Sequence, residues 1–346
     1  MKFLDLFAGI GGFRLGMEAA GHECVGFCEI DKFARASYKA IHDTKGEIEL
    51  HDITAVSDDT VRGIGHVDVI CGGFPCQAFS IAGKRQGFED TRGTLFFEIA
   101  RFASILRPRL LFLENVKGLL NHDGGDTFET ILSTLDELGY DAEWQVLNSK
   151  NFGVPQNRER VFIIGHLRGA SARGVFPFRG EGSKFDSEQP EIDIVGNTKN
   201  PNGTAYGTSS VVYSSEGLSG TLCARDYKEP KQVAIPVLRV KEATAQGYAE
   251  AENGDSVNLA HPNSKIRRGR VGKGRANTLL TGESQGVVTP DFRIRKLTPR
   301  ECWRLQGFPD WAFDKAQEVN SNSQLYKQAG NSVTVNVIEA IARELG

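Results

Sequence analysis

Short apolar runs alternate with helical segments along the first half of the chain. The run FLDLF (residues 3–7) ends in the glycine-rich turn AGIGG, and residues 13–20 follow with helical spacing. VDVICGG is a near-continuous apolar run, typical of a parallel strand covered on both faces, and RLLFLENV is a further buried strand. This alternation continues to about residue 168. It predicts an α/β fold with a doubly wound, mostly parallel sheet, whose ligands bind at the carboxyl ends of the strands.

The pattern changes after about residue 169. Gly, Ser, Asn, Thr and Pro become frequent, and helical periodicity returns only at Thr298. Short segments such as SSVVYSS, KQVAIPVLRV and SQGVVTP, separated by turn residues, indicate a small, irregular, strand-rich module. We therefore predict a first domain in residues 1–180, a second in residues 181–319, and a C-terminal helix in residues 320–346 that returns to the first domain.

The composition is that of an ordinary globular protein. The chain has 346 residues, of which 40% are hydrophobic and 25% charged, enough to bury a sizeable core. An apolar run of about 18 residues, which a membrane helix needs, is missing, and Asp5 and Arg14 interrupt the apolar N-terminus. The six cysteines lack the two-residue spacing of zinc or redox motifs. We expect a cytoplasmic protein with reduced thiols and no metal.

The AGIGG turn and two acidic residues are candidates for a nucleotide site. The turn lacks the full GxGxxG phosphate fingerprint, and tight packing alone would also explain its glycines. A nucleotide-like ligand without a pyrophosphate would fit, with Glu29 accepting hydrogen bonds from ribose hydroxyls and Asp52 from an adenine amino group. S-adenosylmethionine is such a ligand.

The segment GGFPCQAFS presents a cysteine just beyond a strand. Its glycines let the backbone approach a bound molecule, and Pro75 fixes one dihedral angle next to Cys76. Buried core thiols are the ordinary interpretation of Cys24, Cys28 and Cys71. Cys76 instead lies in a constrained loop, where a thiolate could attack an electrophile if positive charge lowered its pKa from about 8.5.

Two further segments bring charged groups to strand ends. LLFLENV delivers Glu114 and Asn115 after four apolar residues, although an acid here could also cap the following helix. In QNRERVFIIG, Arg158 and Arg160 alternate on a strand, so both could hold a phosphate or a carbonyl oxygen from one face. A surface ion pair is the alternative for the two arginines.

The net charge of −3 argues against a protein coated in basic residues, but charge is unevenly distributed. The stretch HPNSKIRRGRVGKGR (residues 261–275) holds six Lys or Arg and no acid. From the residues alone, a solvated surface loop and a nucleic-acid contact are about equally good interpretations.

Eight blocks in order carry a family resemblance. They read DLFAGIGGFRLG, EID, HDI, GGFPCQAFS, ENV, QNRERVFIIG, RKLTPRECWRLQGFPD and QAGNSVTVNV. Together they strongly resemble the DNA (cytosine-5) methyltransferases, especially the compact bacterial and phage modification enzymes. The match covers both ends of the chain, and residues 169–291 match only loosely, as expected of the region that reads the DNA target. The resemblance implies a Rossmann-like methyltransferase fold, S-adenosylmethionine as methyl donor, S-adenosylhomocysteine as product, and no metal.

The resemblance also assigns residues. Cys76 falls on the nucleophile, Glu114 on the acid that grips the cytosine, and Arg160, with Arg158 nearby, beside the base. The positions that hold the methyl donor are Phe7, Ala8, Gly9, Ile10, Gly12, Glu29, Ile30, Asp52, Ile53, Pro75, Leu95, Asn331 and Val333. One departure is Ile30, which stands where an aromatic ring often stacks on adenine, and this puts donor affinity in question.

Double-stranded DNA is the implied partner, and residues 181–319 become a target-recognition domain. We expect residues 80–93 to be mobile without DNA and to close over the opened duplex. The predicted DNA contacts are Gln77, Ser80, Lys84, Arg85, Arg92, Arg267, Arg268 and Arg270. Alternatives are a transfer RNA cytosine-5 methyltransferase and a catalytically silent DNA-binding homologue. A monomer is expected, with a separate restriction endonuclease as a conceivable companion.

Overall fold

The computed structural model describes most of the chain apart from several loops. The described residues are 1–75, 95–156, 158–170, 173–177, 194–197, 211–214, 218–219, 221–222, 224, 228, 231–235, 237–252, 255–258, 266, 268–273, 285–287, 293–296 and 298–346. Seven predicted site residues lie outside these ranges, as does the predicted closing loop. They are Cys76, Gln77, Ser80, Lys84, Arg85, Arg92 and Arg267.

The chain folds as two compact units. The first contains residues 1–189, 218–230 and 298–346, and the second contains residues 190–217 and 231–297. In this division the segment from Thr298 onward belongs to the first unit, whereas the predicted second domain extends to residue 319. This segment contacts the N-terminal part of the unit, since Gln156 Nε2 donates to the Leu305 carbonyl at 2.7 Å and Lys315 Nζ donates to the Ile41 carbonyl at 3.3 Å.

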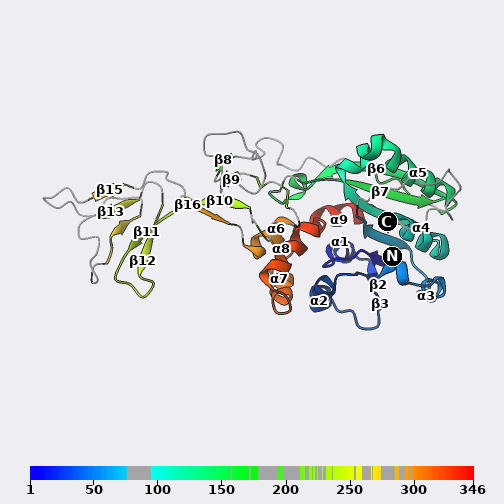
Figure 1. The fold of residues 1–346 in the computed structure, drawn as a ribbon, viewed down its shortest axis with the longest axis horizontal. Helices are drawn as coiled ribbons and strands as arrows, with labels where there is room; N and C mark the ends of the chain where they lie inside the picture. The colour runs from blue at the N-terminus through cyan, green and yellow to red at the C-terminus, as the bar shows by residue number, and fades with distance from the viewer. Residues whose placement is uncertain are drawn as a thin grey trace. The chain divides into compact units, whose positions relative to one another are not determined.

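A seven-stranded sheet forms the centre of the first unit (Figure 1). Its strand order is β3-β2-β1-β4-β5-β7-β6. The strands are β1 (Lys2–Leu6), β2 (Glu23–Cys28), β3 (Ile48–Leu50), β4 (Val69–Gly73), β5 (Leu110–Val116), β6 (Tyr140–Asn148) and β7 (Glu159–Leu167). Strands β1 to β5 pair in parallel, whereas β7 runs antiparallel to both β5 and β6. The predicted α/β fold with a mostly parallel sheet is confirmed.

Helices cover both faces of this sheet. Those in the first half of the chain are α1 (Gly12–Ala19), α2 (Lys32–Ile41), α3 (Asp58–Gly63), α4 (Leu95–Leu106) and α5 (Asp126–Glu137). The C-terminal helices are α6 (Pro299–Leu305), α7 (Asp310–Gln317), α8 (Asn322–Asn331) and α9 (Val335–Ala342). Short 3-10 turns are η1 (Ile53–Ala55), η3 (Lys117–Gly125) and η4 (Ser149–Phe152). Helices α3, α4 and α5 contribute to one core cluster and α1 and α9 to the other, so the sheet is doubly wound.

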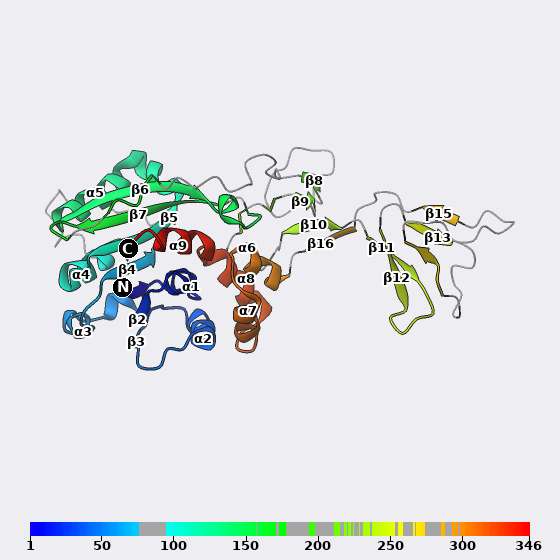
Figure 2. The same cartoon turned by 180° about the vertical axis from the view of Figure 1, so that it is seen from behind.

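The C-terminal helix α9 lies beside α1, as Figures 1 and 2 both show. Gly16 makes this close approach feasible, because a β-carbon at that position would lie 2.7 Å from the β-carbon of Ile338. The two ends of the chain therefore share one core, which contains Met17 and Ile341.

The second unit consists of short strands, as the turn-rich sequence predicts. Strands β8 (Ile194–Asn197), β9 (Val211–Ser214), β10 (Gln232–Ile235) and β16 (Arg293–Lys296) form one sheet. Strands β11 (Val237–Lys241) and β12 (Tyr248–Glu252) form a hairpin, and β13 (Ser256–Asn258), β14 (Val271–Gly272) and β15 (Gln285–Val287) form a third sheet. One described core cluster of this unit contains Val240, Ala251, Val257 and Val271, and Val211, Val212 and Tyr213 of β9 are buried as well.

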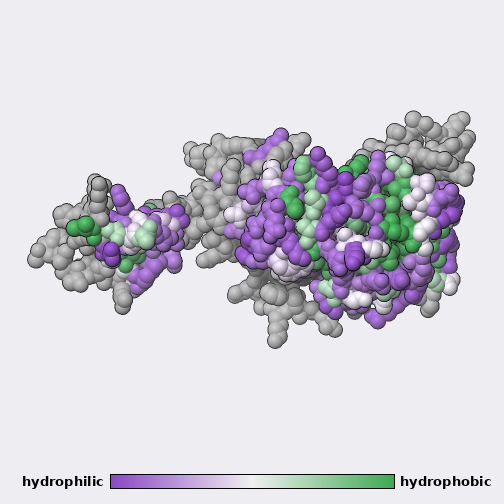
Figure 3. Space-filling model, turned by 90° about the horizontal axis from the view of Figure 1, so that it is seen from below, coloured by the Kyte–Doolittle hydropathy of each residue, from purple (hydrophilic) through white to green (hydrophobic). Residues whose placement is uncertain are grey.

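The described surface of the first unit is mainly hydrophilic on the face shown in Figure 3, with smaller hydrophobic patches. Among the described helices, none is long and apolar enough to cross a membrane.

Asp5 is an unusual buried acid in the central strand. Its side chain is fully buried, and the Tyr38 hydroxyl donates a hydrogen bond of 3.4 Å to Oδ2. Burial raises the pKa of Asp5 from 3.8 to about 8, although the Arg14 guanidinium opposes this shift. The folded protein therefore keeps Asp5 protonated near neutral pH, while the unfolded chain ionises it. Stability from this group is greatest below pH 3.8 and is lost as the pH rises toward 8.

We expect Asp5→Asn to stabilise the protein, because the amide preserves the shape of the neutral acid and does not ionise. The free energy of unfolding should rise by about 2 kcal/mol at pH 7 and by much less at pH 4.5. Urea unfolding at the two pH values measures this difference. A gain or loss of equal size at both would contradict the titration as its cause.

Candidate active site

A cavity of about 480 Å³ opens where several strands of the first unit end. Phe7 and Gly9 line it after β1, Glu29 after β2, Pro75 after β4, and Glu114 at the end of β5. The cavity thus lies at the carboxyl ends of neighbouring strands, next to the point where strand order reverses between β1 and β4. A volume of this size suits a nucleoside-sized ligand.

Most of the residues that the resemblance assigns to the methyl donor line this cavity. They are Phe7, Gly9, Ile10, Glu29, Ile30, Asp52, Ile53, Pro75, Leu95 and Asn331. Ala8, Gly12 and Val333 do not belong to this lining. Gly12 serves packing, because a β-carbon there would come within 2.8 Å of the Ser332 hydroxyl and of a Val333 methyl group.

The glycine-rich turn leaves room for a ligand next to its backbone. Gly9 and Gly11 adopt positive φ angles of 56° and 84°, which disfavour other residues. A β-carbon on Gly9 would meet no atom within 4 Å, whereas one on Gly11 would lie 2.1 Å from the His42 ring. Gly9 therefore borders open space in the cavity, and Gly11 allows His42 to pack below the turn.

Glu29 is held in place by two backbone groups. The Gly9 N–H donates to its Oε2 at 2.8 Å, and the Asp31 N–H donates to Oε1 at 2.7 Å. Burial raises the pKa of Glu29, and these two hydrogen bonds oppose the shift. A carboxylate has about four lone-pair positions, so both oxygens can still accept from ligand hydroxyls.

The other end of the donor lining combines an apolar side chain with an acid. Ile30 is 67% exposed, an unusual exposure for isoleucine that offers an apolar surface to a flat ring. Asp52 Oδ1 accepts hydrogen bonds from the Thr54 N–H and hydroxyl, at 3.0 and 2.7 Å, and these bonds lower the pKa of Asp52. The residues present therefore fit an adenosine-containing ligand such as S-adenosylmethionine.

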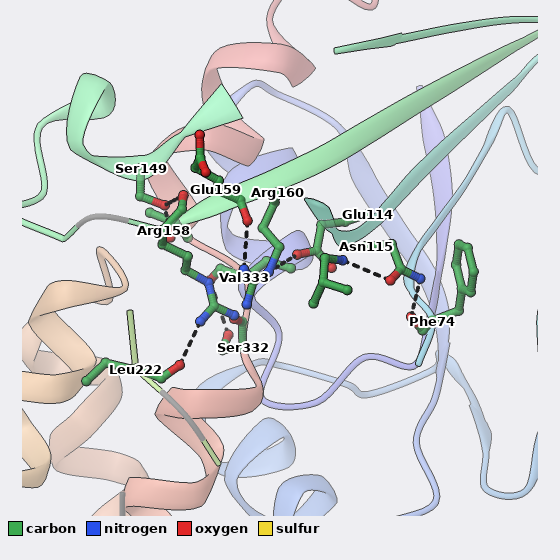
Figure 4. A network of polar contacts seen from close by, with 12 residues as sticks. Phe74, Glu114, Asn115, Ser149, Arg158, Glu159, Arg160, Leu222, Ser332 and Val333 are labelled. Atoms are coloured by element: carbon green, nitrogen blue, oxygen red, sulfur yellow. Dashed lines mark hydrogen bonds and ion pairs between the residues drawn. The ribbon is translucent and has the colours of Figure 1, made fainter. Parts of the chain in front are cut away.

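Glu114 is a buried acid that also lines the cavity, and Figure 4 shows it beside Arg160. Its side chain forms an ion pair with Arg160, in which Nε lies 3.0 Å from Oε1. Burial raises the pKa of Glu114, while the charges of Arg160 and Arg158 lower it. A β-carbon on Gly73 would lie 3.0 Å from the other oxygen, so the glycine in β4 makes space for this carboxyl group.

Asn115 ties β5 to the loop that follows β4. Its Nδ2 donates to the Phe74 carbonyl at 2.8 Å, and its Oδ1 accepts from the Val116 N–H at 2.8 Å (Figure 4). The sequence marks Asn115 by its place beside Glu114 but assigns it no partner. The structure shows that it fixes the backbone two residues before Cys76.

Arg158 and Arg160 both line the cavity but make different contacts. The Arg158 guanidinium is buried and donates to three backbone carbonyls, at 2.7 Å to Ser332, 3.3 Å to Gly330 and 3.1 Å to Leu222 (Figure 4). Arg158 thus binds carbonyl oxygens of the protein backbone. The sequence analysis named a phosphate or a carbonyl oxygen as its possible partners. These contacts are typical of a residue that positions the backbone around it.

The sequence missed several lining residues from the C-terminal segment and the β2 end. They include Asp31, Ala34, Lys327, Gln328, Gly330 and Ser332. The available signal was that Asp31 belongs to the EID block and that Gln328, Gly330 and Ser332 belong to the QAGNSVTVNV block. The described residues contain no group of three or more acidic, histidine or cysteine side chains placed to hold a metal.

The two described arginines of the basic stretch differ in exposure. Arg268 is exposed, and its Nε donates to the Ala243 carbonyl at 2.8 Å. Arg270 is 5% exposed and donates from its guanidinium to the Lys241 carbonyl at 2.9 Å. The two arginines therefore differ in exposure, and the DNA-contacting role of both stays a prediction.

Comparisons with known proteins agree with this fold and identify the family. The model of the C-5 cytosine-specific DNA methylase family matches residues 1–346. The type II methyltransferase M.HhaI of Haemophilus parahaemolyticus is 36% identical, over 100% of this chain and 94% of its own length. M.HpaII of Haemophilus parainfluenzae is 38% identical, over 99% of this chain and 88% of its own length. The orphan methyltransferase M.SPRI of Bacillus phage SPR is 34% identical, over 100% of this chain and 97% of its own length. The chain belongs to the C-5 cytosine-specific DNA methylase family.

Solved structures share the fold at lower identity. The Dnmt2 methyltransferase of S. pombe has a TM-score of 0.59 at 16% identity, over 98% of this chain and 96% of that one. The Entamoeba histolytica methyltransferase EhMeth has a TM-score of 0.53 at 16% identity, over 100% of this chain and 97% of that one.

Proposed function

We propose that the protein transfers a methyl group from S-adenosylmethionine to carbon 5 of a flipped-out cytosine in a specific sequence of duplex DNA. The observation that carries this proposal is the single cavity that joins a nucleoside-type lining around Glu29 to the buried Glu114–Arg160 pair. Family membership supplies the cytosine-5 chemistry. Protection of DNA in a restriction-modification system or in a phage is the proposed biological role.

The chain's residues position both reaction partners. Glu29 accepts from ribose hydroxyls, Asp52 accepts from the adenine amino group, and Ile30 contacts one face of the adenine ring. The bound donor supplies an electrophilic methyl group on its sulfonium. Arg160 orients Glu114 and lies beside the base, whereas Arg158 fixes the loop around Ser332 that closes the cavity from the C-terminal side.

Cytosine carbon 5 is a poor nucleophile, so the ring is activated first. The Cys76 thiolate forms a bond to carbon 6 while protonated Glu114 gives its proton to ring nitrogen 3, and the displaced electron pair becomes available at carbon 5. After carbon 5 has been methylated, it loses its proton to solvent. The carbon–sulfur bond then breaks, the thiolate leaves, and nitrogen 3 returns its proton to Glu114.

A stacked cytosine hides carbon 6, so the target nucleotide must rotate out of the duplex at a cost of a few kcal/mol. Binding contacts to the flanking strands must offset this cost. Residues 80–93, attached directly to Cys76, contain Lys84, Arg85 and Arg92 and remain the proposed source of such contacts.

Methyl transfer from labelled S-adenosylmethionine to duplex DNA and to transfer RNA tests the proposal. We expect label in DNA alone, because all three curated relatives above are full-length matches and two are named type II methyltransferases. Bisulfite sequencing of DNA from a host that expresses the chain then locates the methylated site. Label in transfer RNA alone would establish the RNA alternative, and none in either would favour a silent homologue.

We expect the double variant Arg267→Ala/Arg268→Ala to bind duplex DNA about tenfold more weakly. The slope of log K against log salt concentration should become shallower by the amount that corresponds to about one to two phosphate contacts. Binding titrations at several salt concentrations measure both quantities. Arg62→Ala is the matched control, since Arg62 is an exposed arginine paired with Asp59 on α3. An unchanged salt slope in the double variant would refute the DNA-contacting role.

A further inference from the structure

Asp31 and Lys327 meet at the edge of the donor cavity, and the mechanism above uses neither. Asp31 precedes α2, whereas Lys327 lies in α8, 296 positions later in the chain. Both residues line the cavity. Their ion pair joins Lys327 Nζ to Asp31 Oδ2 at 2.7 Å.

Asp31 connects three parts of the site through three separate atoms. Its backbone N–H donates to Glu29 Oε1 at 2.7 Å. Its Oδ1 accepts from the N–H groups of Phe33 and Ala34, at 2.8 and 3.3 Å, and so caps the first turn of α2. Its Oδ2 takes the ammonium of Lys327. A shift of Asp31 would therefore move one of the two hydrogen bonds that orient Glu29.

The ion pair adds little to the attachment of α8 to α2. The neighbouring Gln328 is buried, donates to the Phe33 carbonyl at 3.1 Å and accepts from the Ser37 hydroxyl at 3.0 Å. The side chains of Lys327 and Asp31 are 41% and 27% exposed, and ion pairs of such exposure add about 0–1 kcal/mol to stability. Its contribution is therefore to the placement of Asp31 rather than to folding.

We propose that Lys327 is a positioning residue for the methyl donor. Through Asp31 it keeps Glu29 in the orientation that accepts the ribose hydroxyls. The inference rests on the proposed function, and it identifies a determinant of donor affinity that lies outside the residues assigned to the donor by resemblance.

Lys327→Met tests this inference, because methionine keeps the length of the side chain and removes its charge. In calorimetric titrations without DNA, we expect the Kd for S-adenosylhomocysteine to rise about tenfold. The KM for S-adenosylmethionine should rise equally while kcat stays within about twofold, the split expected for lost ground-state binding. Lys327→Arg should restore most of the affinity, since a guanidinium can also pair with Asp31.

Lys39→Met is the matched control. Lys39 forms an equally short ion pair with Glu49, at 2.7 Å, and does not belong to the cavity lining, so donor affinity should not change. Asp31→Asn combined with Lys327→Met should bind S-adenosylhomocysteine no more weakly than the worse single variant. Fully additive losses would mean that Lys327 contacts the donor directly and would overturn the inference.

The outcomes also separate this inference from the proposed function. If the unmodified protein binds S-adenosylhomocysteine and Lys327→Met binds it equally well, the positioning role is wrong and the methyltransferase assignment stands. If the unmodified protein binds neither donor nor product, the proposed function itself fails.

Discussion

Cys76→Ala abolishes DNA methylation, with an expected loss of at least about ten-thousandfold in kcat, because carbon 6 then lacks its nucleophile. No thiol of the described cavity lining can replace it. Cys28 is the cysteine in that lining, and its Sγ donates to the His51 carbonyl at 3.3 Å. Burial raises the pKa of Cys28 to about 12, so its thiol stays protonated.

The measurement is covalent trapping on duplex DNA that carries 5-fluorocytosine at the methylated site. The unmodified protein should become irreversibly attached in the presence of S-adenosylmethionine, and mass spectrometry should place the adduct on Cys76. Cys24→Ala is the control, since Cys24 is a buried core thiol outside the cavity lining, and it should trap DNA normally. Methylation by Cys76→Ala at the normal rate would remove the covalent step from the mechanism.

The neighbourhood of Cys76 depends on β4 and β5 being adjacent in the sheet. Gly73 pairs with Glu114, so the acid and the loop that leads to the nucleophile start from one register position. Asn115 then holds the Phe74 carbonyl at 2.8 Å. One strand therefore carries the proposed proton donor and also restrains the backbone that leads to the proposed nucleophile, an arrangement that would favour simultaneous attack and protonation.

The sequence identifies many residues of the cavity lining because the signals are local. An apolar strand followed by glycines, or by a single acid such as Glu29 or Glu114, marks a strand end, and parallel strands bring those ends together. The parallel core of the sheet and its double winding follow from the same alternation. The antiparallel pairing of β7 with β5 carries no such local signal.

Contacts between distant segments explain what the sequence could not predict. Arg158 reaches carbonyls 64 to 174 positions away, and only the folded chain shows that these, rather than a ligand, occupy its guanidinium. The sequence does not distinguish the buried Arg270 from its exposed neighbour Arg268, because a run of basic residues does not indicate which side chains are buried. The helical segment after Thr298 belongs to the first unit, where Gln156 Nε2 donates to the Leu305 carbonyl, 149 positions away.

Glu114→Gln lowers kcat about a thousandfold, because the amide cannot deliver a proton to ring nitrogen 3 when Cys76 adds to carbon 6. The structure supports this expectation through the buried setting of the acid, which raises the pKa of Glu114 despite the nearby arginines. The protonated form is the active one. The rate of the unmodified protein should therefore fall as the pH rises through this elevated pKa, and the residual rate of the variant should lack this alkaline limb.

Single-turnover methylation across pH 5.5 to about 9 measures both effects, with S-adenosylhomocysteine binding as the test of an intact donor site. Glu143→Gln makes the same chemical change in β6, where the carboxylate accepts the Val175 and Phe176 N–H groups outside the cavity, so its kcat should stay within about twofold. If Glu114→Gln kept both its rate and the alkaline limb, another group would have to protonate the ring. Glu114 would then serve only to anchor Arg160 beside the base.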